Sequence, residues 1–311
     1  MKRVQTMKKP ISASGLKHGL QRQSAGRILA WAVLSTLIAF TLLPLWMVLK
    51  TALVHPTDLF TSATDVLPVT PTLVNFEKVL GMISTEEALA LGGSGAEINF
   101  IRALGNSALF TAITVALQTT CAAMAAYAFA RLRFPGRQSL FGLFIASMMV
   151  PGVVTLIPNF ILIRDLGWLN TMAGMVAPFC LMQGFSIFFL RQFFLSVPRD
   201  LEEAALLEGA SHFTIFWRVM LPLSITPLAT IATLTGINMW NEFFWPYLVG
   251  KDEMLQVLPV ALQTFKSQTP QGQPDWTGLM AATTITVLPT VFLLLAFGRQ
   301  VVESVQFSGS K

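Results

Sequence analysis

The stretch that decides the fold class is residues 28–49, ILAWAVLSTLIAFTLLPLWMVL, which contains no charged side chain. A helix needs about 20 mostly apolar residues to cross a bilayer. The composition of the whole chain agrees, because 53% of its 311 residues are hydrophobic and only 12% are charged. Soluble domains carry about 25% charged residues. The sequence therefore predicts a membrane protein, and no hydrophilic segment is long enough to hold a soluble catalytic domain.

This first apolar run is expected to remain in the membrane as an anchor. A cleavable signal peptide has an apolar core of about 7–15 residues followed by a small-residue cleavage site. The run here is longer, and the residues after it, Lys50-Thr51-Ala52-Leu53-Val54, do not form such a site.

Five further apolar runs predict an all-α, polytopic membrane protein with six transmembrane helices. The expected spans are 28–49, 104–128, 139–161, 171–190, 223–246 and 278–298. They divide the chain into a basic N-terminal segment, 1–27, a six-span domain, 28–298, and a tail, 299–311. Within the domain, an inner loop covers 191–222, and outer loops cover 50–103 and 247–277.

The basic residues predict that both termini are cytoplasmic, because cytoplasmic loops carry an excess of Lys and Arg. The inner segments hold 15 of the 21 basic residues: Lys2, Arg3, Lys8, Lys9, Lys17, Arg22, Arg27, Arg131, Arg133, Arg137, Arg191, Arg199, Arg218, Arg299 and Lys311. The outer segments hold six: Lys50, Lys78, Arg102, Arg164, Lys251 and Lys266. The net charge of +5 thus reflects membrane topology and lipid, and we expect no nucleic acid partner.

The sequence offers no pattern for a metal, a cofactor or a disulfide. The three histidines are scattered without the spacing of metal ligands. Cys121 and Cys180 lie inside apolar runs, where free cysteine behaves as a small core residue.

The inner loop is the most structured hydrophilic segment. Residues 196–222 read SVPRDLEEAALLEGASHFTIFWRVMLP. Pro198 suits a first helical position, and acidic residues follow it where the helix dipole favours them. Gly209 fits a left-handed stop, Ser211 a cap for a second helix, and Pro222 a break before the fifth span. On physical grounds alone, this is also the pattern of a pair of interfacial amphipathic helices.

The same loop resembles a family motif. Glu203-Ala204-Ala205, then Gly209 after three intervening residues, then Val219 and Leu221-Pro222, is similar to the loop motif of permease subunits in binding-protein-dependent ABC importers. The flanking segments resemble the carbohydrate-uptake branch, and specifically the maltose-type second permease subunit. These segments are Asn106-Ser107, 126–136, 151–158, 166–171 and 240–246, and the resemblance runs over about 28–311.

Two departures from the family pattern stand out. Glu208 occupies a position that is commonly Asp, which keeps the charge of the motif. In the tail, Ser304 and Ser308 stand where glycines are usual, with Lys311 at the matching end. The role of the tail is therefore left open.

The resemblance implies that the loop is a coupling helix that docks into a cleft on an ATPase subunit. The residues carried over to that role are Glu203, Ala204, Ala205, Glu208, Gly209, Leu221 and Pro222. The implied partners are a second permease subunit, two ATP-binding subunits and a periplasmic or lipid-anchored solute-binding protein, in the inner membrane of a bacterium or archaeon. The chain has no Gly-x-x-x-x-Gly-Lys-Ser/Thr phosphate loop, so we expect it to be no enzyme and ATP hydrolysis to occur on a separate subunit.

A second set of candidate residues lies near the outer end of the fifth span. Asn238, Asn241 and Glu242 are polar in an apolar run, and such residues are candidates for a translocation path. They fit equally well a simpler role in packing against a partner subunit. The solute is expected to be a sugar, an oligosaccharide, a polyol or glycerol phosphate.

Two other functions compete with the importer permease. An ion-coupled secondary transporter predicts ionisable residues at mid-span and broken helices in symmetric halves, and the spans here carry almost no mid-membrane charge. A membrane scaffold without a transport role leaves the loop motif unexplained.

Overall fold

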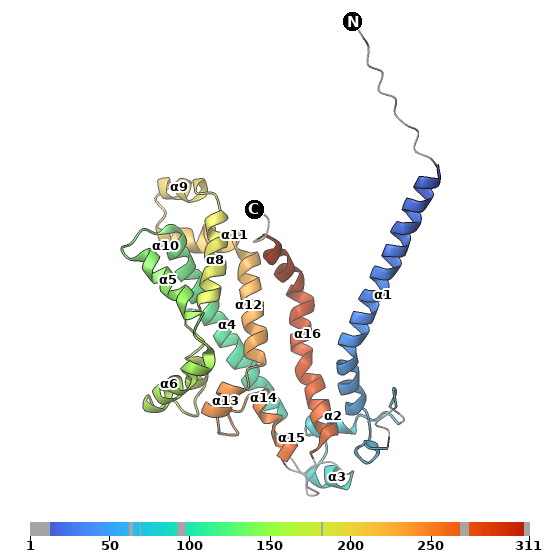
Figure 1. Ribbon diagram of the computed structural model, residues 1–311. Helices are drawn as coiled ribbons and strands as arrows, with labels where there is room; N and C mark the ends of the chain where they lie inside the picture. The colour runs from blue at the N-terminus through green and yellow to red at the C-terminus, as the bar shows by residue number, and fades with distance from the viewer. Residues whose placement is uncertain are drawn as a thin grey trace.

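The computed structural model describes residues 13–61, 65–68, 70–91, 98–181, 183–267 and 274–307, and all regular structure in these ranges is helical (Figure 1). Residues 1–12 of the predicted basic segment and 308–311 of the predicted tail lie outside them. The helices are α1 Ala13–Ala52, η1 Pro56–Asp58, α2 Val74–Val79, α3 Thr85–Ala90, α4 Phe100–Arg131, α5 Arg137–Ser147, α6 Gly152–Asp165, α7 Met172–Val176, α8 Gly184–Ser196, α9 Asp200–Leu207, α10 His212–Ile215, the π-helix η2 Phe216–Met220, α11 Leu221–Leu223, α12 Ile225–Trp240, α13 Phe244–Val249, α14 Leu258–Ala261, α15 Thr264–Ser267 and α16 Trp276–Phe307.

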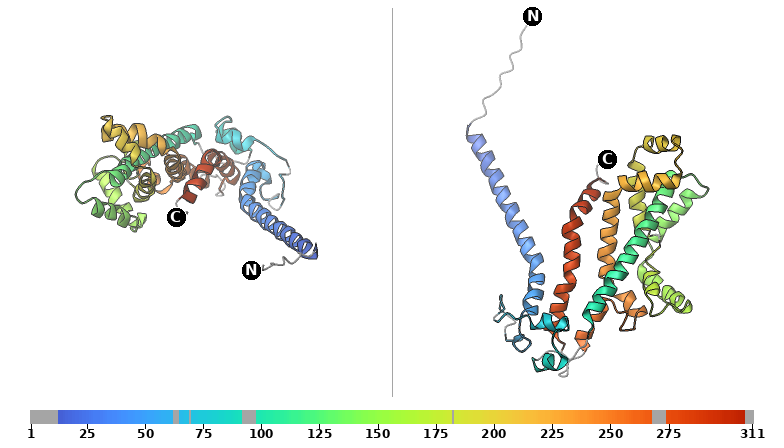
Figure 2. Two further views of the ribbon diagram at one scale, coloured as in Figure 1. Left: turned by 90° about the horizontal axis from the view of Figure 1, so that it is seen from above. Right: turned by 180° about the vertical axis from the view of Figure 1, so that it is seen from behind.

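The helices form a bundle with two distinct ends. The α9 end carries α9, α10 and α11, and the opposite α2 end carries α2, α3 and α13 to α15 (Figures 1 and 2). Between the ends, α4 packs against α8 and α12, and α12 packs against α16. The first helix, α1, packs mainly on α16 and leans away from the bundle toward the α9 end.

Within the described ranges, three helices are long and apolar enough to cross a membrane: 26–52 in α1, α4, and 276–300 in α16. Two bent pairs, α5 with α6 and the α10–α11 segment with α12, raise the number to five if each pair is one span. The structure thus shows an all-helical membrane protein with three to five candidate spans, and three of the six predicted ranges are not single straight helices.

The predicted third span, 139–161, is broken in its middle. Helices α5 and α6 meet at an angle of 101°. Pro151 is the N-cap of α6 and has extended backbone angles. A proline disfavours helical geometry in the residue before it and removes a backbone donor, so the helix ends ahead of Pro151. Pro158, by contrast, lies inside α6 without ending it.

The predicted fourth span, 171–190, is divided between the short α7 and the 13-residue α8. At 1.5 Å per residue, α8 is about 20 Å long, which is shorter than the roughly 30 Å hydrocarbon core. Helix α8 extends to Ser196, so the inner loop begins later than the expected residue 191. Gly184 lets α8 approach α5 closely, because a Cβ there would lie 2.5 Å from the Phe144 carbonyl oxygen.

The predicted fifth span, 223–246, is straight only within α12. Pro222 lies inside the helix that runs without a break from α10 through η2 to Leu223, and the break expected at Pro222 is not there. The chain instead bends by 80° at Ser224, between α11 and α12. At the other end, α12 stops at Trp240, and α13 begins at Phe244.

Small residues hold the core of the α9 end together. Ala122, Ala123 and Ala126 of α4 are buried against α8, where Ile187 and Leu190 are fully buried. Small side chains allow helix backbones to approach closely in a membrane. At the edge of this core, the Tyr127 ring packs against Phe194 at 6.4 Å and Phe216 at 5.4 Å, so α4, α8 and η2 share one aromatic contact.

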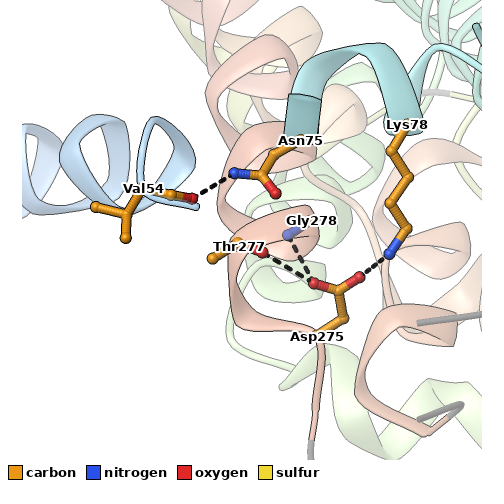
Figure 3. Close-up of polar contacts among 6 residues, drawn as sticks. All are labelled: Val54, Asn75, Lys78, Asp275, Thr277 and Gly278. Carbon is orange, nitrogen blue, oxygen red and sulfur yellow. Dashed lines mark hydrogen bonds and ion pairs between the residues drawn. The ribbon is translucent and has the colours of Figure 1, made fainter. Parts of the chain in front are cut away.

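A buried polar cluster holds the α2 end together (Figure 3). The Asn75 side chain donates hydrogen bonds to the carbonyl oxygens of Ala52 at 2.9 Å and Val54 at 2.7 Å, which fastens α2 to the end of α1. Lys78 forms a buried ion pair with Asp275. The Asp275 carboxylate also accepts a 2.9 Å hydrogen bond from the Gly278 N–H and so caps α16. Helix α2 thus connects α1, the first long helix, with α16, the last.

Candidate functional site

Helix α9 forms where the loop sequence predicts a helix. It runs over Asp200–Leu207 with three acidic residues in its first turn. Carboxylates in a first turn are favourable because the unpaired N–H groups there carry partial positive charge. Pro198 lies two residues ahead of the helix, so the expectation that it takes the first helical position is wrong. The N-cap is Arg199, whose side chain makes no capping hydrogen bond.

Gly209 ends α9 in the left-handed conformation that the sequence predicts, with φ of 83°. The Gly209 N–H bonds the Leu206 carbonyl oxygen, and the Ala210 N–H bonds the Ala205 carbonyl oxygen, each at 3.0 Å. This pair of bonds is the Schellman arrangement that closes a helix. A Cβ at Gly209 would meet nothing within 4 Å, so the position requires glycine for its backbone angles and not for space.

Ser211 caps the second helix as predicted. Its hydroxyl accepts a 3.2 Å hydrogen bond from the Thr214 N–H. The helix then runs through α10, η2 and α11 to Leu223, longer than the sequence suggested. Its buried residues Ile215, Phe216 and Met220 pack into the core of the α9 end, whereas Phe213 and Trp217 are exposed.

The loop leaves most of its predicted docking residues accessible at one end of the molecule. Glu203, Ala204, Glu208 and Gly209 are exposed, and Ala205 is half-buried. The last turn of α9 adds Leu207, which is 90% exposed. Leu221, half-buried, and Pro222, exposed, lie on α11 at the same end of the molecule. An acidic and apolar helix surface of this kind is suited to a partner groove.

Glu202, also on α9, is not among the predicted docking residues. It points inward and is 8% exposed, whereas the next residue, Glu203, is exposed. Its carboxylate oxygen lies 2.7 Å from Nε of Arg131, the last residue of α4. The Arg131 Nη2 donates hydrogen bonds of 2.6 Å to the carbonyl oxygens of Phe194 and Val197. The sequence could have indicated that Glu202 and Glu203 face different directions, because adjacent side chains on a helix point about 100° apart.

The residues predicted for a translocation path lie at the end of α12 nearer α2. This is the end of the bundle opposite α9. Asn238 and Asn241 are exposed, and Asn241 donates a 2.7 Å hydrogen bond to the Ile237 carbonyl oxygen of its own helix. Glu242 is half-buried and accepts a 3.1 Å hydrogen bond from the Trp245 N–H. Glu242, one residue ahead of the N-cap Phe243, therefore holds the first turn of α13, which gives this carboxylate a structural role.

A cavity of about 600 Å³ opens at the α2 end. It is lined by the turn after α2, the start of α4 and the segment around residue 254, including Arg102 and Glu253. Asn106 and Ser107, one of the segments that resemble the carbohydrate-uptake branch, hold this part of the chain in place. The Asn106 amide donates to the Met254 and Gln256 carbonyl oxygens at 2.9 and 3.0 Å, and the Ser107 hydroxyl accepts from the Leu258 N–H at 2.7 Å.

Within the described residues, no group of three or more His, Cys, Asp or Glu side chains is arranged to hold a metal ion. Cys121 and Cys180 are both free thiols.

Comparisons with known proteins place these features in context. Residues 118–306 match the family model described as binding-protein-dependent transport system inner membrane component. The chain is 31% identical over 266 residues to the sn-glycerol-3-phosphate transport system permease protein UgpE of Salmonella typhi, covering 86% of this chain and 91% of that protein. It is 33% identical over 207 residues to the arabinooligosaccharides transport system permease protein AraQ of Halalkalibacterium halodurans, covering 67% of this chain and 73% of that protein.

The fold is also similar to a solved structure. A chain in the crystal structure of a bacterial ABC transporter involved in the import of the acidic polysaccharide alginate matches with a TM-score of 0.75 at 22% identity. The match covers 94% of this chain and 99% of that one. At this identity, the likeness shows the shared fold.

Proposed function

The chain belongs to the family of inner membrane components of binding-protein-dependent transport systems, and we propose that it is a permease subunit for a sugar or sugar-like solute whose helix α9 docks on an ATPase subunit. The observation that carries the docking proposal is the open surface of α9, closed by Gly209 and presented at one end of the bundle.

Several expectations from the sequence follow directly from the family. The chain is a multi-pass permease of the inner membrane, it is not an enzyme, and it carries no cofactor. ATP is hydrolysed on a separate subunit, and a binding protein delivers the solute. The family assignment confirms the resemblance to importer permease subunits and sets aside both the ion-coupled transporter and the scaffold.

The solute class rests on the relatives. Two of them are named for arabinooligosaccharides and for sn-glycerol 3-phosphate, both of which are polyhydroxylated and strongly hydrated. We infer a sugar, a short oligosaccharide or a polyol phosphate as the solute. We propose Asn238, Asn241 and Glu242 as contacts along its path. The first two are exposed, and Glu242 is half-buried and held by the Trp245 N–H.

The arrangement in the membrane is the second part of the proposal. Both termini face the cytoplasm, as the distribution of basic residues indicates. The α9 end is then cytoplasmic, and the α2 end, with its cavity, faces the binding protein. Six crossings remain our proposal, with α7 and α8 together as the crossing that hydropathy and helix length do not identify. The exposed apolar side of α1 faces lipid or the second permease subunit.

The docking proposal is tested by co-purification. Tagged permease is isolated from cells that express the whole transporter, and the ATPase recovered per permease is measured with the wild type and with Glu203→Lys. Recovery should fall with the variant, while its level in the membrane should not change. Uptake is then screened with radiolabelled maltose, arabinotriose and sn-glycerol 3-phosphate. Wild-type ATPase recovery with Glu203→Lys would refute the docking role of α9.

The orientation is tested by labelling. Single cysteines replace Gln138, in the first turn of α5, and Glu86, on α3, in a variant with Cys121→Ala and Cys180→Ala. Both positions are exposed, and they lie at opposite ends of the bundle. An impermeant thiol reagent should label only the cysteine at 86 in intact cells. Labelling at 138 would overturn the proposed topology.

A further inference from the structure

Helix α9 is attached to the membrane-spanning helices through one buried ion pair. Arg131 and Glu202 face one another at 2.7 Å, and their side chains are only 5% and 11% exposed. Within the described residues, this is the only ion pair that α9 makes. The adjoining Ala205 packs on the core, but Glu203 and Ala204 turn away from it.

Arg131 joins three elements at one point. It ends α4, it pairs with the carboxylate on α9, and it donates to the two carbonyl oxygens at the end of α8. A guanidinium can do this because it is planar and always charged, and because it carries five N–H donors in a fixed fork. The final carbonyls of a helix also lack partners within it and carry partial negative charge, which favours a cation there.

We propose that Arg131 and Glu202 are positioning residues that transmit a displacement of α9 to α4 and α8. This inference rests on the proposed docking of α9 on an ATPase subunit. A force applied to the exposed surface of α9 acts on Glu202 from the opposite side of the same helix, and through Arg131 it reaches the ends of two helices. Tyr127, one turn before Arg131, continues this connection into η2 through its contact with Phe216.

Binding of the ATPase and transmission of its movement should depend on different residues of α9. The surface around Glu203 holds the ATPase, whereas the buried pair passes the movement of α9 on to α4 and α8. Loss of the pair should therefore leave docking intact and remove the response of the spanning helices to ATP. A pair that serves only the stability of the fold would not produce this separation.

The experiment uses the whole complex with a reporter on α8. A cysteine at the exposed position Gln192 carries a bimane label in the background lacking Cys121 and Cys180. The fluorescence change on trapping with ATP and vanadate is compared for the wild type, for Glu202→Gln and for the control Asp200→Asn, which removes an exposed charge from the same helix. With Glu202→Gln, the fluorescence change should be largely lost, because α9 is then no longer paired with Arg131. ATPase recovery should stay at the wild-type level. Asp200→Asn should match the wild type in both.

Two outcomes overturn the inference. One is a wild-type fluorescence change with Glu202→Gln. The other is a loss of ATPase recovery equal to that of Glu203→Lys, which would make Glu202 part of the docking surface. Failure of docking itself is recognised separately, because Glu203→Lys then recovers ATPase normally.

A double variant keeps the test valid if a single change leaves the partner charge buried and the protein unstable. Arg131→Gln with Glu202→Gln removes both charges, which relieves that cost. It should fold and bind the ATPase, and it should still lack the fluorescence change. Restoration of the wild-type change by the double variant would show that the pair only balances charge.

Discussion

The two ends of the molecule each contain a buried ion pair, and the two pairs have different surroundings. At the α2 end, Lys78 and Asp275 join α2 to α16, and Asp275 also caps α16 (Figure 3). At the α9 end, Arg131 and Glu202 join α4 to a helix whose other side is open. The first pair fixes one helix of the chain on another. The second connects the bundle to a surface that we propose a partner covers. The same type of interaction can thus serve stability at one end and communication at the other.

The largest expected effect is at the α2 end. Asp275→Ala removes the partner of Lys78 and the cap of α16, and breaking a buried pair on one side typically costs about 3–5 kcal/mol. The purified complex should unfold at a clearly lower temperature in a thermal scan, while ATPase recovery per folded permease remains normal. Asp65→Ala, an exposed acid at the same end, is the control and should leave the midpoint unchanged. Equal midpoints for both variants would remove the stabilising role of the pair.

Charge reversal at α9 should show the opposite pattern. Glu203→Lys replaces an exposed carboxylate at the proposed interface, and loss of a charged contact across an interface typically costs about 2–5 kcal/mol. ATPase recovery should fall strongly, with an unchanged unfolding temperature. Glu86→Lys makes the same reversal on α3 at the α2 end and should leave ATPase recovery at the wild-type level. If both reversals reduce recovery equally, net charge and not the α9 surface controls docking.

Two open glycines give a finer comparison. At both Gly209 and Gly105 an added Cβ would meet no neighbouring atom within 4 Å, but only Gly209 has a positive φ. Gly209→Ala should lower the free energy of unfolding by about 1–2 kcal/mol, because L-residues disfavour the left-handed region. It should also weaken docking. Gly105→Ala, inside α4, should be neutral or slightly stabilising. ATPase recovery and thermal midpoint, measured on both variants, separate the two cases, and similar effects would contradict the conformational argument.

The smallest expected effects concern helix caps. Ser211 caps the helix after α9, and Ser84 caps α3 in a capping box with Glu87. Replacement of either serine by alanine should cost about 1 kcal/mol. Only Ser211→Ala should lower ATPase recovery, since only that cap lies beside the docking surface, and hydrogen exchange should report local fraying in both. As a reference, Thr214→Ala should be milder than Ser211→Ala, because the Ser211 hydroxyl still accepts from the backbone at 214.

Local features of the sequence predicted local structure well. Gly209 and Ser211 have the roles expected of them because a positive φ and an N-cap depend on a few adjacent residues. The span count was less successful, since hydropathy reports how apolar a segment is and not where it turns. The bend of 101° before α6 and the division of α7 from α8 depend on packing with neighbouring helices as well as on Pro151.

The ion pairs could not be predicted for a different reason. Lys78 and Asp275 are 197 residues apart in sequence, and each looks like an ordinary charge in an outer loop. At α9, the sequence points to an acidic helix start but does not show which carboxylate faces the core. Only the rotation of the folded helix separates the buried Glu202 from the exposed Glu203.

The pairing of α1 with α16 has a consequence for biosynthesis. The first helix of the chain packs mainly on the last, and no part of its most apolar 18-residue window is buried by the rest of the subunit. A ribosome adding about 5–20 residues per second needs roughly 10–45 s to synthesise the chain between Ala52 and Trp276. During that interval α1 lacks the helix on which it mainly packs, although α2 is already available to it, so lipid or the insertion machinery must cover its apolar side. The helix bundle of the subunit is complete only when α16 enters the membrane.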